Sequence, residues 1–186
     1  SGALVVGPGL GTDKEAKRLL ALALVSDRPL VLDADALTMI ATGEYHLPDR
    51  CVLTPHPGEA ARLLGVTTAD VQSDRPGSSK HIAERFNAVV VLKGAGTLVA
   101  CPGEPTCILD VASPALAVPG SGDVLAGVIA GLIAQGLGSL AAAYAGVWIH
   151  GHAGLLLADG SAELGLLASE IADKVPEIFS DLRPPG

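Results

Sequence analysis

Residues 119–127 read PGSGDVLAG, a glycine-rich turn followed at once by a long apolar segment. This stretch predicts a helix that begins near Asp123 and leaves the backbone N–H groups of its first turn unpaired. Such N–H groups attract anions, above all phosphates. Because Asp123 is itself an anion, the stretch places a carboxylate where a phosphate would also bind. Either Asp123 only caps the helix, or the turn brings a phosphate and a carboxylate together for chemistry.

On both sides of this turn, short apolar runs alternate with helix-like stretches. We expect strands near residues 3–6, 30–32, 51–53, 88–92, 97–101 and 107–111. Helices are expected after Thr12, before Gly65, at 79–86, after Asp123, at 139–158 and at 166–178, with a loop or short turns at 66–78. Thr12 and Glu15 have the spacing of a capping box. Apolar strands separated by helices predict an α/β fold with a mostly parallel sheet covered on both faces.

The composition narrows the function classes. A hydrophobic content of 49% and a charged content of 17% are typical of a globular chain and exclude a disordered one. The net charge of −8 argues against a nucleic-acid partner. Cys51, Cys101 and Cys107 form no C-x-x-C pair, so we expect buried thiols in a reducing cytoplasm rather than a zinc site. Cys101 and Cys107 would pair only if they lay on adjacent strands.

One segment has the length and apolar character of a membrane span. Residues 124–149 contain no charged side chain. In their middle, Gln135–Ser139 reads as the end of one helix followed by the N-cap of the next. We therefore expect two buried helices of a soluble protein, with no membrane partner.

Glycines and polar residues gather directly after the predicted strands. They are Gly7–Gly11, Asp33 with Asp35, His56–Glu59, Lys93–Thr97 and Ser113–Asp123. Because ligands of open α/β sheets bind at the carboxyl ends of the strands, we expect all of these to face one crevice. The glycines of the first stretch lack the G-x-G-x-x-G spacing of a dinucleotide fingerprint but would let a ligand approach the backbone.

Each charged group in this crevice has a chemical and a structural interpretation. Asp33 and Asp35 would bind a cation or cap a helix, and we favour the cap for at least one of them. His56 would contact a substrate, and Glu59 would orient Mg²⁺ through water or stabilise a helix N-terminus. Lys93 and the small residues after it suit a nucleotide phosphate or ribose, or form a plain β-turn.

The turn Gly120–Gly122 with Asp123 carries the strongest signal. Its N–H groups and the helix dipole would form an anion hole for a phosphoryl group in transfer, and Asp123 would take the proton of the attacking hydroxyl. His150 and His152 are two residues apart and do not share a helix face. We therefore expect buried histidines there rather than a metal pair.

Taken in order, six stretches resemble one known family. Residues 4–11, 31–37, 53–59, 90–97, 120–136 and 146–154 read LVVGPGLG, VLDADAL, LTPHPGE, VVLKGAGT, GSGDVLAGVIAGLIAQG and GVWIHGHAG. They resemble the ADP- or ATP-dependent NAD(P)H-hydrate dehydratases from residue 3 to about residue 158. The resemblance implies a ribokinase-like three-layer α/β/α sandwich. It also implies a lyase that repairs NADH and NADPH hydrates: a nucleotide phosphorylates the ring hydroxyl, and loss of phosphate restores the double bond.

The resemblance also assigns roles to the residues of the crevice. Asp123 would be the catalytic base and contact the substrate hydroxyl, and Glu59 would act on Mg²⁺ indirectly. The hydrated cofactor would lie on Gly9, Gly11 and His56. ADP, or ATP in eukaryotic members, would lie on Lys93, Gly94, Ala95, Gly96, Thr97, Ser113, Pro119, Gly120, Ser121 and Gly122. We also expect homo-oligomers and an NAD(P)H-hydrate epimerase that is fused to the chain or works with it.

This sequence departs from the family in two places. Members have a further segment before the GPGLG stretch, so we expect residues 1–186 to be a single, N-terminally truncated domain. The loop 113–119 reads SPALAVP where the family has an Asn-Pro-Gly-Met-Ala type of sequence, so contacts from that Asn side chain are lost.

Other functions remain as alternatives. A ribokinase-like kinase of a vitamin precursor would share Gly120–Asp123 but would use ATP and leave a stable phosphorylated product. A nucleotide-binding fragment without catalysis would bind nucleotide with no turnover. A membrane hairpin would need detergent to stay in solution.

Overall fold

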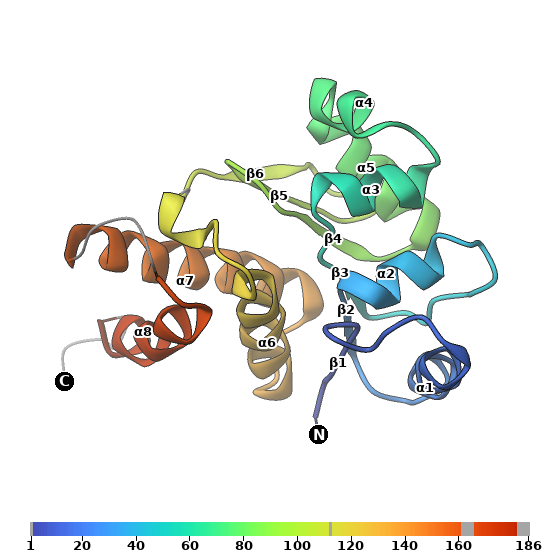
Figure 1. Ribbon diagram of the computed structural model, residues 1–186, viewed down its shortest axis with the longest axis horizontal. Helices are drawn as coiled ribbons and strands as arrows, with labels where there is room; N and C mark the ends of the chain where they lie inside the picture. Colours follow the sequence, from blue (N-terminus) through green and yellow to red (C-terminus); the bar gives the residue numbers. More distant parts are fainter. Residues whose placement is uncertain (1, 112, 161–165, 182–186) are drawn as a thin grey trace.

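A computed structural model describes residues 2–111, 113–160 and 166–181 of the chain (Figure 1). Its centre is a six-stranded sheet in the order β1-β2-β3-β4-β5-β6. The strands are β1 (Leu4–Val6), β2 (Leu30–Leu32), β3 (Cys51–Leu53), β4 (Val89–Leu92), β5 (Thr97–Ala100) and β6 (Cys107–Leu109). Neighbours from β1 to β4 pair in parallel, whereas β4–β5 and β5–β6 pair antiparallel. The predicted mostly parallel sheet is confirmed.

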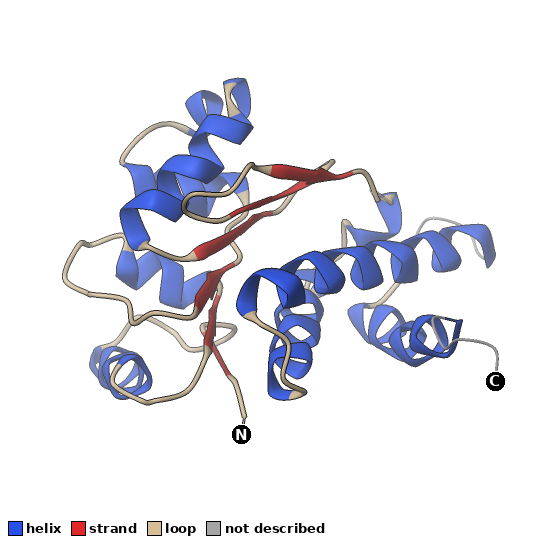
Figure 2. Ribbon diagram, turned by 180° about the vertical axis from the view of Figure 1, so that it is seen from behind, coloured by secondary structure: helices blue, strands red, loops and turns tan. Residues whose placement is uncertain are grey.

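Helices cover both faces of the sheet, which gives three layers (Figures 1 and 2). One face carries α1 (Lys14–Leu24), α2 (Ala34–Ile40), α3 (Pro57–Leu64), α4 (Thr68–Ser73) and α5 (Arg75–Phe86). The other carries α6 (Ser121–Ala134), α7 (Ser139–Gly160) and α8 (Ala168–Asp181), reached through the 3₁₀ turn η1 (Pro114–Leu116). The predicted α/β/α sandwich is confirmed in this arrangement.

The apolar strands follow from this layering. Successive side chains of a strand point to opposite faces, so a strand between two helical layers has to be apolar throughout. In β2, Leu30 and Leu32 enter the core under α1–α5, whereas Val31 enters the core under α6–α8. The residues of β3 and β4 alternate in the same way between the two cores. A shift of one residue in register would therefore exchange the two sets.

The apolar segment 124–149 forms parts of two helices, as predicted. The break between them runs from the end of α6 at Ala134 to the start of α7 at Ser139. In the described part of the chain, one helix (Ser139–Asp159, within α7) is long and apolar enough to cross a membrane. Core helices of soluble proteins pass the same test, and 56% of its most apolar window is buried against the rest of the fold.

The expected capping box at Thr12 and Glu15 is wrong. Asp13 is the N-cap of α1, and its Oδ1 accepts a hydrogen bond from the backbone N–H of Ala16 at 2.8 Å. Aspartate is at least as good a cap as threonine, and its use here starts the helix one residue later.

Residues 66–78, expected to be loop or short turns, contain α4 and the first turn of α5. Thr67 and Asp70 form a capping box at the start of α4. Pro76 lies in the first turn of α5, where the missing N–H of proline costs nothing. Gly77 donates its N–H to the Asp74 cap at 2.9 Å. Pro76 and Gly77 are both compatible with a capped helix start, so the expected loop or short turns are wrong at this position.

The three cysteines are free thiols, as expected. Cys51 is buried in β3, and this burial, with a smaller contribution from the charge of Asp49, raises the pKa of its thiol to about 12. Cys101 is half-buried, and Cys107 is exposed because β6 is the edge strand of the sheet, so the expectation of buried thiols is wrong for Cys107.

The turn after β1 depends on Gly7. Its φ of +132° lies in a region that side chains avoid, and a Cβ there would lie 1.7 Å from the carbonyl oxygen of Asp33. We expect Gly7→Ala to cost more than about 4 kcal/mol of unfolding free energy, or to prevent folding. Gly43 (φ +81°) has no neighbour within 4 Å of its virtual Cβ, so Gly43→Ala should cost only about 1–2 kcal/mol. Urea denaturation of both variants measures the difference, and equal losses would contradict the close contact.

Candidate active site

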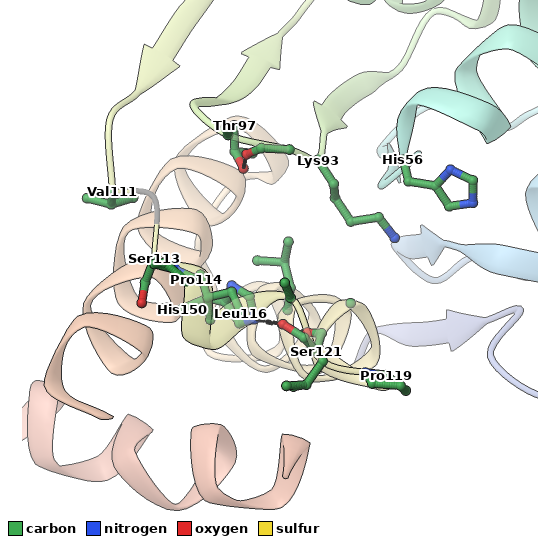
Figure 3. Close-up of a pocket in the computed structure, with 16 residues that line it drawn as sticks. His56, Lys93, Thr97, Val111, Ser113, Pro114, Leu116, Pro119, Ser121 and His150 are labelled. Atoms are coloured by element: carbon green, nitrogen blue, oxygen red, sulfur yellow. Dashed lines mark hydrogen bonds between the residues drawn. The ribbon is translucent and has the colours of Figure 1, made fainter. Parts of the chain in front are cut away.

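A cavity of about 710 Å³ lies between the turn that joins the end of β4 to the start of β5 and the first turn of α6 (Figure 3). Its volume is within the range of sites that enclose a nucleotide-sized ligand. The residues that line it are His56, Lys93, Gly94, Ala95, Thr97, Val111, Ser113, Pro114, Leu116, Ala117, Val118, Pro119, Ser121, Gly122, Leu125 and His150.

The cavity gathers much of the site predicted from the sequence. Of the predicted residues, His56, Lys93, Gly94, Ala95, Thr97, Ser113, Pro119, Ser121 and Gly122 line it. Gly96 and Gly120 belong to the same two turns but do not line it, and neither do Gly9, Gly11, Glu59 and Asp123. Ala112, between the predicted strand 107–111 and Ser113, lies outside the described residues. The structure thus brings the two glycine-containing turns of Lys93–Thr97 and Pro119–Gly122 to one cavity.

Helix α6 begins without a side-chain cap. Gly120 is its N-cap in a left-handed conformation (φ 86°), and no side chain accepts a cap hydrogen bond there. Asp123 lies in the first turn and is exposed. The structural alternative, in which Asp123 is only the N-cap, is therefore wrong. The Ser121 N–H donates to the Val118 carbonyl at 3.2 Å, whereas the N–H groups of Gly122 and Asp123 have no acceptor among the described residues. These two N–H groups remain available to an anion, with the Asp123 carboxylate beside them.

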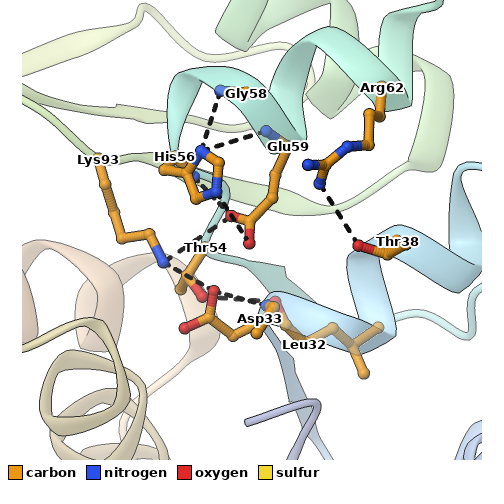
Figure 4. Close-up of polar contacts among 10 residues, drawn as sticks. Leu32, Asp33, Thr38, Thr54, His56, Gly58, Glu59, Arg62 and Lys93 are labelled. Carbon is orange, nitrogen blue, oxygen red and sulfur yellow. Dashed lines mark hydrogen bonds and ion pairs between the residues drawn. The ribbon is translucent and has the colours of Figure 1, made fainter. Parts of the chain in front are cut away.

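Lys93 brings a positive charge to the same place (Figure 4). Its Nζ lies 2.7 Å from Oδ1 of Asp33 and 4.0 Å from Oε2 of Glu59, and both carboxylates are buried. A virtual Cβ on Gly122 would lie 3.0 Å from this Nζ, so the ammonium group adjoins the first turn of α6. The two carboxylates hold Lys93 in position, and the lysine in turn compensates their buried charge.

His56 and Glu59 cap helix α3 reciprocally. Nδ1 of His56 accepts from the backbone N–H of Gly58 at 2.9 Å and of Glu59 at 3.3 Å, and the backbone N–H of His56 donates to Glu59 Oε2 at 2.8 Å. An accepting Nδ1 carries no proton, so the neutral ring has its proton on Nε2, which lies 3.4 Å from Glu59 Oε1. Glu59 therefore has the helix-stabilising role that the sequence offered as an alternative, and its carboxylate also faces Lys93 (Figure 4).

Asp33 and Asp35 accept hydrogen bonds from backbone N–H groups at the start of α2 and in the turn after β1. Asp33 caps α2 by accepting from the N–H of Ala34 at 2.9 Å, as favoured for one of the two. Asp35 accepts from the N–H of Gly11 at 2.8 Å. The backbone of the Gly7–Gly11 turn is thereby tied to α2 rather than left open at Gly11.

Ser113 directs its hydroxyl away from the cavity. Its Oγ donates to the carbonyl oxygen of Gly154 at 2.9 Å and accepts from the N–H of Ala115 at 3.3 Å. The side chain thus anchors η1 on α7.

His150 of α7 was expected to be buried, and it is. Its Nε2 lies 2.9 Å from the carbonyl oxygen of Ser121 and 3.0 Å from Ser121 Oγ. Burial lowers its pKa to about 4, the nearby Lys93 charge acts in the same direction, and the Ser121 hydrogen bond opposes the shift. His152 points elsewhere and contacts the Trp148 carbonyl at 2.9 Å. Among the described residues, no group of three His, Cys, Asp or Glu is placed to hold a metal.

Arg75 was not identified from the sequence. Its guanidinium donates to three backbone carbonyls at the end of β4 and in the turn that follows, those of Leu92, Lys93 and Ala95. Desolvation lowers the pKa of Arg75, and no carboxylate in the described residues pairs with it. The guanidinium thus fixes the turn that presents Gly94 and Ala95 to the cavity.

We expect Arg75→Lys to loosen this turn. An ammonium group has no planar fork, so it cannot reach the three carbonyls together, and a loss of about 2 kcal/mol in unfolding free energy should result. ADP affinity should fall in parallel. Arg62→Lys is the matched control because Arg62 makes one long contact, 3.5 Å to Thr38. Thermal unfolding and equilibrium dialysis measure both effects, and an unchanged Arg75→Lys variant would contradict this role.

The curated relatives with similar sequences are named for the dehydration or repair of NAD(P)H hydrates. The family described as NAD(P)H-hydrate dehydratase matches residues 1–177. An ADP-dependent (S)-NAD(P)H-hydrate dehydratase from Neisseria meningitidis is 47% identical over 178 residues, covering 91% of this chain and 60% of that protein. The bifunctional NAD(P)H-hydrate repair enzyme Nnr from Coxiella burnetii is 44% identical over 168 residues, covering 90% of this chain and 34% of the enzyme. This chain thus spans from about a third to three fifths of these curated relatives.

Solved structures agree with the expected fold. An ADP/ATP-dependent NAD(P)H-hydrate dehydratase from Bacillus subtilis, co-crystallized with ATP and Mg²⁺, has a TM-score of 0.88 at 32% identity, covering 97% of this chain and 65% of that one. A ribokinase-like superfamily protein from Enterococcus faecalis has a TM-score of 0.86 at 27% identity, covering 97% and 63%. The ribokinase-like fold predicted by resemblance is confirmed.

Proposed function

We propose, from the premise that this chain belongs to the NAD(P)H-hydrate dehydratase family, that it dehydrates the S form of NADH and NADPH hydrates at the expense of ADP. The observation that carries the proposal is the start of α6. There, an uncapped helix N-terminus, the Lys93 ammonium and an exposed Asp123 come together beside a cavity of nucleotide size.

The proposed reaction has two steps. Asp123 accepts the proton of the ring hydroxyl, whose oxygen attacks the terminal phosphorus of ADP, so that AMP leaves and a phosphate ester forms. Then the ring carbon–oxygen bond breaks, a proton leaves the neighbouring carbon, and inorganic phosphate and the ring double bond form. The N–H groups of Gly122 and Asp123, with Lys93, stabilise the charge of the phosphoryl group in transfer.

We assign the nucleotide to the cavity and the hydrated cofactor to its Asp123 side. The nucleotide would contact Lys93–Thr97 and the loop from Ser113 to Gly122. His56 lines the cavity, so it can reach a substrate there through Nε2. Gly9 and Gly11 do not line the cavity; they lie in the turn after β1 and remain predicted contacts of the hydrated cofactor.

Mg²⁺ is compatible with these residues in an indirect role. Mg²⁺ keeps several water ligands and is held by one or two carboxylates with substrate phosphates, so it needs no cage of three protein ligands. The buried carboxylates of Asp33 and Glu59 lie next to the anion-binding turn. When bound, the ion would neutralise phosphate charge, and Glu59 would hold one of its waters.

ADP is the proposed phosphate donor. The Neisseria meningitidis relative is named ADP-dependent, whereas the Bacillus subtilis enzyme is named ADP/ATP-dependent. The test supplies hydrated NADH, Mg²⁺ and either ADP or ATP, and measures both phosphate and NADH. We expect one phosphate released per NADH formed, with ADP preferred. A stable phosphorylated product with no NADH would favour the kinase alternative instead.

The expected partners follow from the same family. Several relatives are named bifunctional repair enzymes, and we propose that an epimerase, fused or separate, supplies the S form to this site. The free thiols fit a reducing, cytoplasmic location. Self-association stays a prediction that sedimentation velocity tests.

A further inference from the structure

Ser121 and His150 form a buried contact between two helices at the cavity wall (Figure 3). Ser121 is the first residue of α6 and is 5% exposed, and His150 comes from α7 and is 7% exposed. One ring nitrogen, Nε2 of His150, is within hydrogen-bond distance of both the carbonyl oxygen and the hydroxyl oxygen of Ser121.

The carbonyl oxygen decides where the imidazole proton lies. A carbonyl oxygen only accepts, so the Nε2 atom that lies 2.9 Å from it carries a proton and donates. The same N–H also points at Ser121 Oγ at 3.0 Å, which therefore accepts as well. The ring is neutral near pH 7 because its pKa is lowered to about 4, so this donor adds no positive charge.

The proton of the Ser121 hydroxyl therefore has no acceptor among the described residues. Among the described residues, Ser121 Oγ has no hydrogen-bond partner other than His150. A hydroxyl whose oxygen accepts from the ring directs its own proton away from the ring, and Ser121 lines the cavity. It stands beside the N–H groups of the α6 turn, where a phosphoryl oxygen would bind.

We propose that the Ser121 hydroxyl is a side-chain donor of the anion-binding turn and that His150 is the positioning residue that orients it. The inference rests on the proposed function, because it places the terminal phosphoryl group of ADP at this turn. His150 also lines the cavity, and its proposed role is exerted through Ser121. The His150 ring holds the Ser121 hydroxyl and the Ser121 carbonyl oxygen in fixed orientations. The hydroxyl donor is therefore already positioned when the nucleotide binds.

The test compares ADP with AMP, which lacks the terminal phosphoryl group. Affinities of both nucleotides are measured by equilibrium dialysis with Mg²⁺, for Ser121→Ala, His150→Leu and His150→Gln. We expect Ser121→Ala and His150→Leu each to weaken ADP about tenfold, since a hydrogen bond to a charged group is lost, and to leave AMP within about twofold. His150→Gln, whose amide N–H replaces the ring N–H, should restore ADP affinity to within about threefold of the original.

Two controls separate positioning from damage to the fold. His152→Leu changes the neighbouring histidine, which contacts Trp148 instead, and should leave both affinities unchanged. In a Ser121→Ala background, His150→Leu should add less than about a twofold loss, because the two residues act as one unit. Thermal unfolding reports stability separately.

The result that overturns the inference is a folded Ser121→Ala or His150→Leu variant that binds ADP normally. An equal loss of ADP and AMP affinity, not recovered by His150→Gln, also overturns it, and so does an original protein that does not bind ADP. Failure of the proposed function looks different. If the protein binds ADP with the expected pattern but forms no NADH from the hydrate, the dehydratase proposal fails and the Ser121–His150 inference stands.

Discussion

Asp123→Asn is expected to abolish turnover of the hydrate while ADP still binds. Asparagine is nearly isosteric but cannot accept the hydroxyl proton, so the rate should fall by roughly 10²–10⁴-fold. ADP affinity should stay constant or rise slightly, because the substitution removes a negative charge beside the phosphate site. Steady-state kinetics of NADH formation, with equilibrium dialysis for ADP, separate the two effects.

A matched control for Asp123→Asn is Asp110→Asn. Asp110 is also exposed and acidic, but it lies between β6 and η1 and does not line the cavity. It should keep the original rate. An Asp123→Asn variant that retains more than about half of the activity would contradict the assignment of Asp123 as the base.

Lys93→Met is expected to harm both stability and nucleotide binding. The substitution leaves the Asp33 and Glu59 carboxylates buried without their cation, so we expect a loss of about 3 kcal/mol in unfolding free energy. It also removes the ammonium group beside Gly122, and ADP affinity should fall at least about tenfold. Urea denaturation and equilibrium dialysis measure the two quantities.

A second substitution separates these two effects of Lys93. In a Lys93→Met background, Asp33→Asn removes the unpaired carboxylate, and asparagine still caps α2. Most of the lost stability should return, whereas ADP affinity should not. Recovery of ADP affinity in the double variant would contradict a direct role for Lys93, since it would mean that Lys93 only stabilises the fold.

The sheet and the helical layers on its two faces could be predicted, because a strand that is buried on both faces leaves a local pattern in the sequence. Leu30–Leu32 and Cys51–Leu53 contain no polar residue, as is typical of a strand that lies between two helical layers. The break at Gln135–Ser139 was predictable in the same way from cap chemistry. The gathering of His56 and Lys93 at one cavity followed from parallel strand order.

Contacts between residues that are distant in the sequence leave no local pattern, so they could not be predicted. Arg75 reaches the turn after β4 from a segment that looked like loop, and only the fold brings its guanidinium to the Leu92 carbonyl. His150 looked like an ordinary core histidine, and its contact with Ser121 spans 29 positions. Sequence patterns report periodicity and caps, which are local, whereas these two side chains act on backbone that another element presents.

The choice between cap and base at Asp123 also needed the backbone. Both interpretations place an aspartate at the start of a helix, and they differ only in whether its oxygen meets the helix N–H groups. Gly120 in the left-handed conformation starts α6 three residues earlier than a cap at Asp123 would, which frees that carboxylate.

The central claim is that this chain restores NADH from its hydrate at the expense of ADP. The most direct measurement is the recovery of NADH absorbance from the S form of hydrated NADH with Mg²⁺, in the presence and absence of ADP. We predict recovery that requires ADP and stops when ADP is exhausted, with AMP and phosphate as products. No recovery from a folded protein that binds ADP would contradict the claim.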